Sequence, residues 1–199
     1  TEQKLTEDTL RLSAVIVDNT ADAITITNKH NRIIEINRAF TEITGYSREE
    51  VLDKNPSIIK SGKHTQSFYT EMWADILNKG MWQGELWNRR KNGELFPVWE
   101  TITTVRDSEG KIVNYVSIFS DISTIKRSQE NLDFLAHHDP LTQLPNRTLF
   151  NDRLDHALRR AQRENTELAL IFLDLDRFKT INDSLGHPLG DLVLKLAAQ

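Results

Sequence analysis

Residues 82–106 carry the stretch that decides the fold, and they read WQGELWNRR-KNGE-LFPVWETITTVR. Asn92-Gly93 lies between a run with two tryptophans, residues 82–90, and a run rich in β-branched and aromatic residues, residues 95–106. This dipeptide is the strongest short hairpin signal, because both of its residues accept the positive φ angles of a tight turn. Pro97 opposes a strand locally, since proline cannot donate a hydrogen bond to a central ladder. The stretch therefore predicts two antiparallel strands, over residues 82–90 and 95–106.

The segments on either side extend this pattern. Ser108-Glu109-Gly110 predicts a turn into a further strand over residues 112–121. Upstream, residues 23–27 and 32–36 have strand patterns around a turn at residues 29–31. Helical signals lie between them and the hairpin: residues 37–44 closed by Gly45, a capping box from Ser47 to Glu50, and Phe68, Met72 and Ile76 at helical spacing. Two strands, several short helices and three strands predict an α+β domain.

Four short motifs follow this order of elements. They are Asn37-Arg38-Ala39-Phe40, Gly45-Tyr46, Asn88-Arg89-Arg90-Lys91-Asn92-Gly93-Glu94 and Asp121-Ile122-Ser123. With these motifs, residues 21–123 resemble a PAS sensor domain. The resemblance implies the PAS fold, a five-stranded antiparallel sheet with flanking helices. It implies no particular ligand, because domains of one fold differ in their sites.

The C-terminal third has a different pattern. An apolar run from Leu168 to Leu173 predicts a buried strand, and it ends at Asp174 and Asp176. Residues two apart in a strand share a face, so both carboxylates can project the same way. Magnesium binds one or two carboxylates and completes its shell with water and phosphates, which suits such a pair. The alternative is a strand that ends in solvated acids before a polar helix.

Two motifs connect this pattern to a known family. They are Asp139-Pro140-Leu141-Thr142-Gln143-Leu144-Pro145-Asn146-Arg147 and the run from Leu173 to Asp191. Residues 137–199 with these motifs resemble the opening of the GGDEF family, the diguanylate cyclases that join two GTP molecules into cyclic di-GMP. The resemblance implies metal binding by Asp174 and the backbone carbonyl of Leu175. It also implies that five residues contact GTP. Asn182 and Asp191 would bind the guanine edge, and His187 would belong to the nucleotide site. Phe178 and Lys179 would lie near the phosphates.

The Gly-Gly-Asp-Glu-Phe hairpin that names this family does not occur in the sequence. By resemblance, that hairpin supplies the second acidic metal ligand, and phosphoryl chemistry of this kind relies on paired cations. We therefore expect residues 139–199 to be an incomplete α/β nucleotide-cyclase-like domain, inactive in this chain, from a parent protein that is a cyclase or a degenerate relative. A lone strand with two unpaired edges should also leave this third marginally stable.

A cofactor site is a further expectation for the PAS region. All four tryptophans lie between residues 73 and 99. The stretch from Asn55 to Lys91 is similar to flavin-binding redox-sensor PAS domains, which implies Asn88 as the polar contact of a flavin such as FAD and Trp82 as apolar wall. The alternatives are an unknown ligand or a pocket filled by aromatic core. A haem is disfavoured, because the sequence offers only His64 as a plausible axial ligand and the other histidine of the PAS region lies in a predicted turn.

Helices connect these parts. Ile122, Ile125, Gln129, Leu132 and Ala136 recur at three- and four-residue steps, which predicts an amphipathic connecting helix over residues 122–138. A weaker pattern predicts an N-terminal helix over residues 1–20. We expect a homodimer through the PAS and linker helices, in which a pocket event shifts the connecting helix. The alternative is a helix folded onto its own PAS sheet.

Composition excludes several classes. The chain has 199 residues, a net charge of -4 and no cysteine. Without cysteine there is no disulfide, thiolate metal site or flavin–cysteine adduct. The mild acidity offers no footprint for nucleic acid, no run predicts a membrane segment, and a cytoplasmic location is the default. The sequence thus predicts a PAS input coupled by a helix to part of a cyclase domain, in a cyclic di-GMP signalling protein. The alternative is a PAS ligand-binding or dimerisation module without enzymatic output.

Overall fold

The structure is a computed structural model, and it describes residue 4, residues 11–12 and residues 15–199. Residues 11–12 and 15–19 are helical, and the rest of the helix expected over residues 1–20 lies mostly outside the described residues. The chain divides into two compact units, Thr1–Ile125 and Lys126–Gln199. We describe each unit by itself.

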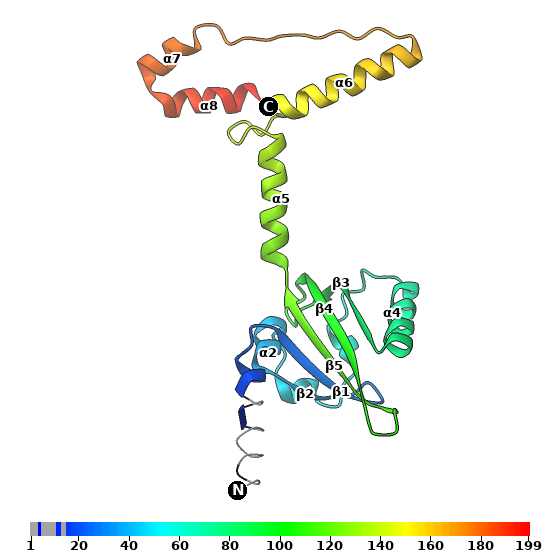
Figure 1. Cartoon of the computed structure of the whole chain (residues 1–199). Helices are drawn as coiled ribbons and strands as arrows, with labels where there is room; N and C mark the ends of the chain where they lie inside the picture. Colours follow the sequence, from blue (N-terminus) through cyan, green and yellow to red (C-terminus); the bar gives the residue numbers. More distant parts are fainter. Residues whose placement is uncertain (1–3, 5–10, 13–14) are drawn as a thin grey trace. The chain divides into compact units, whose positions relative to one another are not determined.

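The first unit contains the expected five-stranded antiparallel sheet, in the order β2-β1-β5-β4-β3 (Figure 1). Its strands are β1 Ala23–Asn28, β2 Ile33–Ile36, β3 Met81–Arg89, β4 Leu95–Arg106 and β5 Ile112–Asp121. Its helices are α2 Arg38–Thr44, α3 Arg48–Val51, the 3₁₀ helix η1 Pro56–Ile59 and α4 Gln66–Lys79. This order confirms the predicted PAS fold.

The predicted β3–β4 hairpin forms, but of Asn92 and Gly93 only the glycine has a positive φ. Gly93 has a φ of 91°, which side chains rarely tolerate, and its N–H donates to the Arg90 carbonyl at 2.9 Å. Pro97 is accommodated because the β4–β5 ladder begins only at Val98, one residue later. The Pro97 carbonyl accepts instead from the N–H of Ile122, at 3.1 Å. Strand β4 can therefore lie inside the sheet, between β5 and β3, despite its proline.

Asn37 joins the first strand to the first helix. Its Oδ1 accepts from the N–H of Ile24 at 2.8 Å and from that of Phe40 at 3.0 Å, so one side chain both pairs with β1 and caps α2. In β1 the threonines Thr25 and Thr27 are buried, while the neighbouring isoleucines are half-buried. The inner face of the sheet is therefore partly polar, which matters for the site below.

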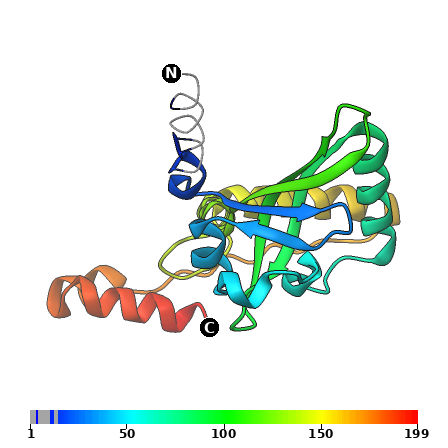
Figure 2. The ribbon, with the colours of Figure 1, turned by 90° about the horizontal axis from the view of Figure 1, so that it is seen from below.

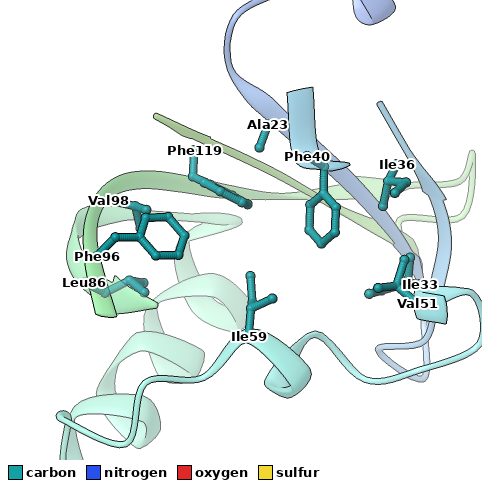
Figure 3. Close-up of a cluster of buried hydrophobic side chains, with 10 residues drawn as sticks. All are labelled: Ala23, Ile33, Ile36, Phe40, Val51, Ile59, Leu86, Phe96, Val98 and Phe119. Atoms are coloured by element: carbon teal, nitrogen blue, oxygen red, sulfur yellow. The ribbon is translucent and has the colours of Figure 1, made fainter. Parts of the chain in front are cut away.

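The helices cover one face of the sheet. Helix α4 packs on β3 and β4, whereas α2 packs on β1 (Figures 1 and 2). The core between them is a single cluster of buried apolar side chains. Figure 3 shows Leu86, Phe96 and Val98 at one end and Ile33, Ile36 and Val51 at the other, with Phe40 and Ile59 between them. The strands and helices thus enclose an apolar interior that opens onto the polar threonines of β1.

The second unit is helical. Its elements are α5 Ser123–His137, which begins in the first unit, α6 Arg147–Glu164, α7 Phe178–Leu185 and α8 His187–Ala197. Helix α5 matches the predicted connecting helix to within one residue at each end. Asn146 caps α6 by accepting from the N–H of Leu149, at 3.1 Å. No described helix is both long and apolar enough to cross a membrane.

The predicted buried strand from Leu168 to Leu173 is wrong for this structure. Residues 166–175 have no regular secondary structure, and Leu173 is 94% exposed. A strand exists only when a neighbour pairs with its backbone groups. Within described residues 126–199 the only β-type pairing is an isolated bridge between His138 and Pro145. The apolar run therefore has the composition of a strand but no sheet to join.

Candidate functional site

A cavity of about 650 Å³ lies inside the PAS unit, between the sheet and the helices that cover it. Its volume falls within the roughly 300–1,000 Å³ of small-molecule sites. Apolar side chains from the sheet and from η1 form much of the wall, including Leu86, Phe119 and Ile59. Tyr69 and Trp73 line it from α4. The cavity is thus shaped by the same elements that build the core.

Polar side chains from four strands also line this cavity. They are Thr25 and Thr27 on β1, Asn88 on β3, Glu100 on β4 and Ser117 on β5. Strand register decides which of them meet. Thr25 pairs with Ser117, and Glu100 lies opposite Phe119, two residues from Ser117. Glu100, Ser117 and Thr25 therefore lie near one another in the sheet.

Glu100 is the one acidic residue in the cavity wall, and it is 9% exposed. The Ser117 hydroxyl donates to its Oε1 at 2.5 Å, and no cationic side chain forms an ion pair with it among the described residues. Burial raises the pKa of Glu100 to about 7, and the hydrogen bond from Ser117 partly opposes this. The carboxyl group can therefore change its charge near neutral pH.

Two further polar atoms in the cavity wall have no partner. The Asn88 side chain is 4% exposed and its Nδ2 makes no hydrogen bond, and the same holds for Oγ1 of Thr27. An unsatisfied buried polar group costs about 1–3 kcal/mol. Native structures leave few such groups, and a bound ligand or water is a common explanation. Asn88 thus lies in the cavity wall with an unpartnered donor, and its role as a ligand contact stays a prediction.

Trp82, the predicted apolar wall, does not line the cavity. Its ring folds over Gly84, where an added Cβ would lie 2.8 Å from the tryptophan Cζ2, and packs edge-on against Phe68 with centroids 6.0 Å apart. Trp73 is the tryptophan that lines the cavity, in an edge-on contact with Tyr115. The absence of a side chain at residue 84 explains why Trp82 turns along its own strand.

His64, the candidate haem ligand, does not line the cavity either. Its Nε2 accepts from the backbone N–H of Trp87 at 2.9 Å, and its ring stacks on Phe68 at 4.3 Å. Burial lowers the pKa of His64, which favours the neutral ring that this acceptor role needs. Because His64 does not line the cavity and its Nε2 already accepts a backbone hydrogen bond, the residues do not fit a haem.

A cluster around Arg90 connects the hairpin to the start of α5. Arg90 pairs with Asp121, donates to the Ile43 carbonyl and lies 4.0 Å from the ring centre of Phe96. Asp121 in turn accepts from the N–H of Ser123 at 2.8 Å. Burial opposes the charged form of Asp121, but hydrogen bonds from Ser123 and Arg90 outweigh it and lower the pKa of its carboxyl group. The beginning of α5 is therefore tied to β3 and β4.

The predicted nucleotide residues lie in the second unit and are only partly brought together. Asp174 and Leu175 lie in the exposed irregular segment, where the Leu175 carbonyl accepts from the N–H of Phe178 at 3.3 Å. Phe178, Lys179 and Asn182 are on α7, and His187 and Asp191 are on α8. These two helices pack on each other. Among the described residues, Asp174 forms no hydrogen bond or ion pair with these helices.

The fit of this segment to magnesium is incomplete. Asp174 and the Leu175 carbonyl are oxygen donors of the right type, but the strand that would orient them is not formed. Among the described residues, no group of three or more acidic, histidine or cysteine side chains could hold a metal ion. Asn182, the predicted guanine contact, differs from Asp174 in having a buried side-chain oxygen. This oxygen, Oδ1, lies beside Gly190 and has no hydrogen-bond partner.

Sequence reasoning missed Glu100, Ser117 and Thr27. A signal existed for the first of these: Phe96, Val98, Glu100 and Ile102 alternate along β4, so the glutamate stands in an otherwise apolar inward series. A charged residue at such a position is rarely buried without a reason. The threonines of β1 could not be assigned to the interior in the same way, because the isoleucines between them are the more apolar set.

A five-stranded antiparallel sheet with helices on one face and a partly polar cavity between them is the architecture of an α+β domain that can bind a small ligand. The chain belongs to the PAS family: residues 21–124 match the family model described as "PAS domain". Residues 136–199 match the model "Diguanylate cyclase, GGDEF domain". The predicted order, a PAS domain followed by the first part of a GGDEF domain, is thereby confirmed.

Known proteins resemble the chain in the same way. It is 33% identical over 128 residues to the nitrogen fixation regulatory protein of Klebsiella oxytoca, covering 64% of this chain and 26% of that protein. It is 27% identical over 187 residues to the cyclic di-GMP phosphodiesterase PdeR of Escherichia coli K12, covering 94% of this chain and 28% of that protein. The chain therefore spans little more than a quarter of the length of these relatives.

A solved structure supports the fold. The PAS domain of a protein from Colwellia psychrerythraea superposes with a TM-score of 0.55 at 23% identity, covering 58% of this chain and 98% of that one.

Proposed function

We propose that the chain is the sensing and coupling part of a cyclic di-GMP signalling protein. The PAS cavity receives a small ligand, α5 transmits its presence, and the GGDEF region belongs to the output. The observation that carries the proposal is the cavity itself. It contains buried, unpartnered polar groups and lies in the domain whose last strand leads directly into α5. Both the GGDEF family description and the name of the E. coli relative support cyclic di-GMP as the messenger.

The coupling route follows the Arg90 cluster. Glu100 lies on β4, the strand whose Pro97 carbonyl binds the N–H of Ile122, and Ser117 lies on β5, which ends at Asp121. A ligand that moves these strands changes the geometry at the first turn of α5. This route supports a transmitted signal, and a demonstration needs two states of the helix.

A homodimer through α5 is part of the proposal. Ile125 and Leu132 lie on the predicted seam and are 62% and 66% exposed. Exposed apolar residues at three- and four-residue steps are typical of a helix that packs on another helix. A reaction that joins two GTP molecules gives such pairing a purpose. GTP and Mg²⁺ are the proposed ligands of the complete GGDEF domain, and the proposed location is the cytoplasm.

A flavin such as FAD remains a candidate cofactor for the cavity. The free Nδ2 of Asn88 fits an acceptor on the edge of an isoalloxazine ring, and the cavity volume suits a ring system. A bound flavin would supply redox chemistry, while Asn88 would orient the ring. The visible absorption spectrum of the purified protein tests this: flavin bands support the cofactor, and a colourless protein contradicts it.

The main proposal is tested by cyclic di-GMP itself. Bacteria that produce the full-length protein containing this chain are compared with cells carrying an empty vector, and the messenger is quantified by mass spectrometry. We expect the wild-type protein to change the cyclic di-GMP level. The Asp174→Ala variant should reduce that change at least tenfold if the parent is a cyclase, whereas Asp155→Ala, at an exposed position on α6, should not. An unchanged messenger level with well-produced wild-type protein would contradict the proposal.

A further inference from the structure

The cavity has two polar ends, and Asn88 marks only one of them. Asn88 pairs with Phe96 across the β3–β4 ladder, and Glu100 lies four residues farther along β4. At about 3.3 Å per residue, the two positions are roughly 13 Å apart along the strand. The wall between them is apolar and includes Leu86. A ligand contact at Asn88 therefore leaves the acidic end of the cavity unexplained.

Aromatic rings from α4 and β5 line the same cavity as Glu100. Tyr69 and Trp73 approach from α4, and Tyr115 lies two residues from Ser117 on β5. Trp73 and Tyr115 are in edge-on contact, with centroids 5.3 Å apart. A cation already uses this wall, since the Lys60 Nζ lies 3.9 Å from the ring centre of Tyr69. Aromatic faces attract cations, and the effect grows when water is excluded.

The residues of the fold do not satisfy Glu100. Its carboxyl group receives one hydrogen bond, from Ser117, and no ion pair among the described residues. Burying a carboxylate without a cation is costly, and an apolar residue would cost nothing at this position. A buried carboxylate, its hydroxyl partner and the aromatic rings that line the same cavity together match a ligand with a protonated amine.

We propose that the PAS cavity binds an organic amine, with its ammonium group on Glu100 and Ser117 and its apolar or aromatic body along the wall toward Asn88. The free Nδ2 of Asn88 favours ligands with a hydrogen-bond acceptor at the far end. The claim that an amine is the sensed signal rests on the proposed function. The claim that the cavity binds an amine rests on the cavity alone.

Binding is measured by titration calorimetry on the 199-residue chain. The probes are 2-phenylethylamine, tyramine and tryptamine, each beside the alcohol that replaces its alkyl amine. At pH 8 we expect at least one amine to bind at least tenfold more tightly than its alcohol. If no amine exceeds its alcohol, or if a co-purified flavin fills the cavity and excludes all three, the proposal is overturned.

Variants assign the effect to Glu100. Glu100→Gln should reduce the affinity for the amine to that of the alcohol, while Glu71→Gln, at an exposed position on α4, should leave it unchanged. Equal amine binding by the wild type and Glu100→Gln would overturn the proposal. If Glu100→Gln does not fold, carbon NMR of the wild-type carboxyl groups replaces it. The amine must then lower the pKa of Glu100, and the alcohol must not.

The pH dependence is a second readout. From pH 8 to pH 6 the amine should lose about tenfold in affinity, because Glu100 takes up a proton over this range while an alkyl ammonium, like lysine, stays charged. The other titratable groups in the wall are Lys60, Tyr69 and Tyr115. Burial raises the pKa of Tyr69 further above this pH range. A flat profile for the amine would overturn the proposal. None of these measurements involves cyclic di-GMP, so the inference and the proposed function can fail separately.

Discussion

At the scale of single residues, Glu100 determines the chemistry of the PAS unit. It lies in an apolar series on β4, its neighbour Ser117 supplies one hydrogen bond, and no cationic side chain of the described residues forms an ion pair with it. Asn88 and Thr27 add polar atoms that the fold leaves unpaired. A domain that needed only stability would have apolar groups at these positions, because packed apolar side chains avoid the cost of desolvation. These residues are therefore best understood as the functional part of the interior.

Glu100 should make stability depend on pH. Its folded pKa of about 7 lies above the reference value of 4.5, so the folded state binds more protons than the unfolded state between these values. The stability of the wild type should accordingly decrease from pH 5 to pH 8. Glu100→Gln should match the wild type near pH 5 and exceed it at pH 8, by on the order of 3 kcal/mol. Urea unfolding at both pH values measures this.

Glu71→Gln serves as the control, since Glu71 is exposed on α4. It should have the pH profile of the wild type. A Glu100→Gln variant that is less stable than the wild type at pH 8 would show that the carboxylate has a cationic partner in the folded protein.

At the scale of elements, the Arg90 cluster connects the β3–β4 hairpin to α5. Arg90 is 18% exposed, pairs with Asp121 and lies over Phe96, so it combines an ion pair, a backbone hydrogen bond and a ring contact. Its planar guanidinium group can make these contacts together, whereas a lysine ammonium group cannot. The first turn of α5 therefore depends on one side chain from the preceding hairpin.

Arg90→Lys should lower the free energy of unfolding by about 1–3 kcal/mol, because it keeps the charge but loses the planar contacts. Arg38→Lys is the matched control. Arg38 pairs with Glu42 on the surface of α2 with its side chain 76% exposed, and it should change stability by less than about 0.5 kcal/mol. Denaturant unfolding followed by tryptophan fluorescence provides the comparison. Equal effects of the two substitutions would rule out the structural role assigned to Arg90.

The irregular segment at residues 166–175 is the second informative element. It contains Ile171, Phe172 and Leu173, all exposed, where a sheet strand was predicted. In the 199-residue chain, brief digestion with chymotrypsin should cut first at Phe172 and leave the PAS unit intact, since Phe96 and Phe119 are buried. Mass spectrometry of the fragments identifies the sites. First cuts within the PAS sheet would contradict this.

At the scale of the whole molecule, α5 begins in the first unit and continues in the second, and the two units differ in their secondary structure. The PAS unit has a five-stranded sheet, a core and a cavity. The second unit consists of helices, and its apolar run is unpaired. Signal transmission in the proposed protein then depends on how α5 associates with a second copy, which is a property of the assembled molecule.

Leu132→Glu should dissociate the proposed dimer, because it places a charge at the centre of the apolar seam. Arg127→Glu also introduces an acid on α5, but away from the seam, and should leave the dimer intact. Analytical ultracentrifugation should show the mass fall from twice the 23.0 kDa of the chain to that of the chain for Leu132→Glu only. A monomeric wild type at micromolar concentration would contradict the proposed assembly.

The sequence by itself determined the order of strands and helices in the PAS unit and the position of α5. These features follow from local rules: Asn92-Gly93 accepts the backbone angles of a tight turn, and alternating or helical periodicity appears directly in the residues. The order of the two domains was also available, because it rests on short motifs. Asn88 was named from the same motifs and lies in the cavity wall, and its role as a ligand contact stays a prediction.

Only the tertiary structure decided which side chains surround the cavity. Strand register brings Glu100, Ser117 and Thr25 together from three strands, and Gly84 lets Trp82 fold away from the cavity while Trp73 reaches it from α4. Such contacts depend on residues far apart in the chain. The segment from Leu168 to Leu173 illustrates the same physical reason, since apolar composition favours a strand, but only a neighbouring strand can satisfy its backbone hydrogen bonds.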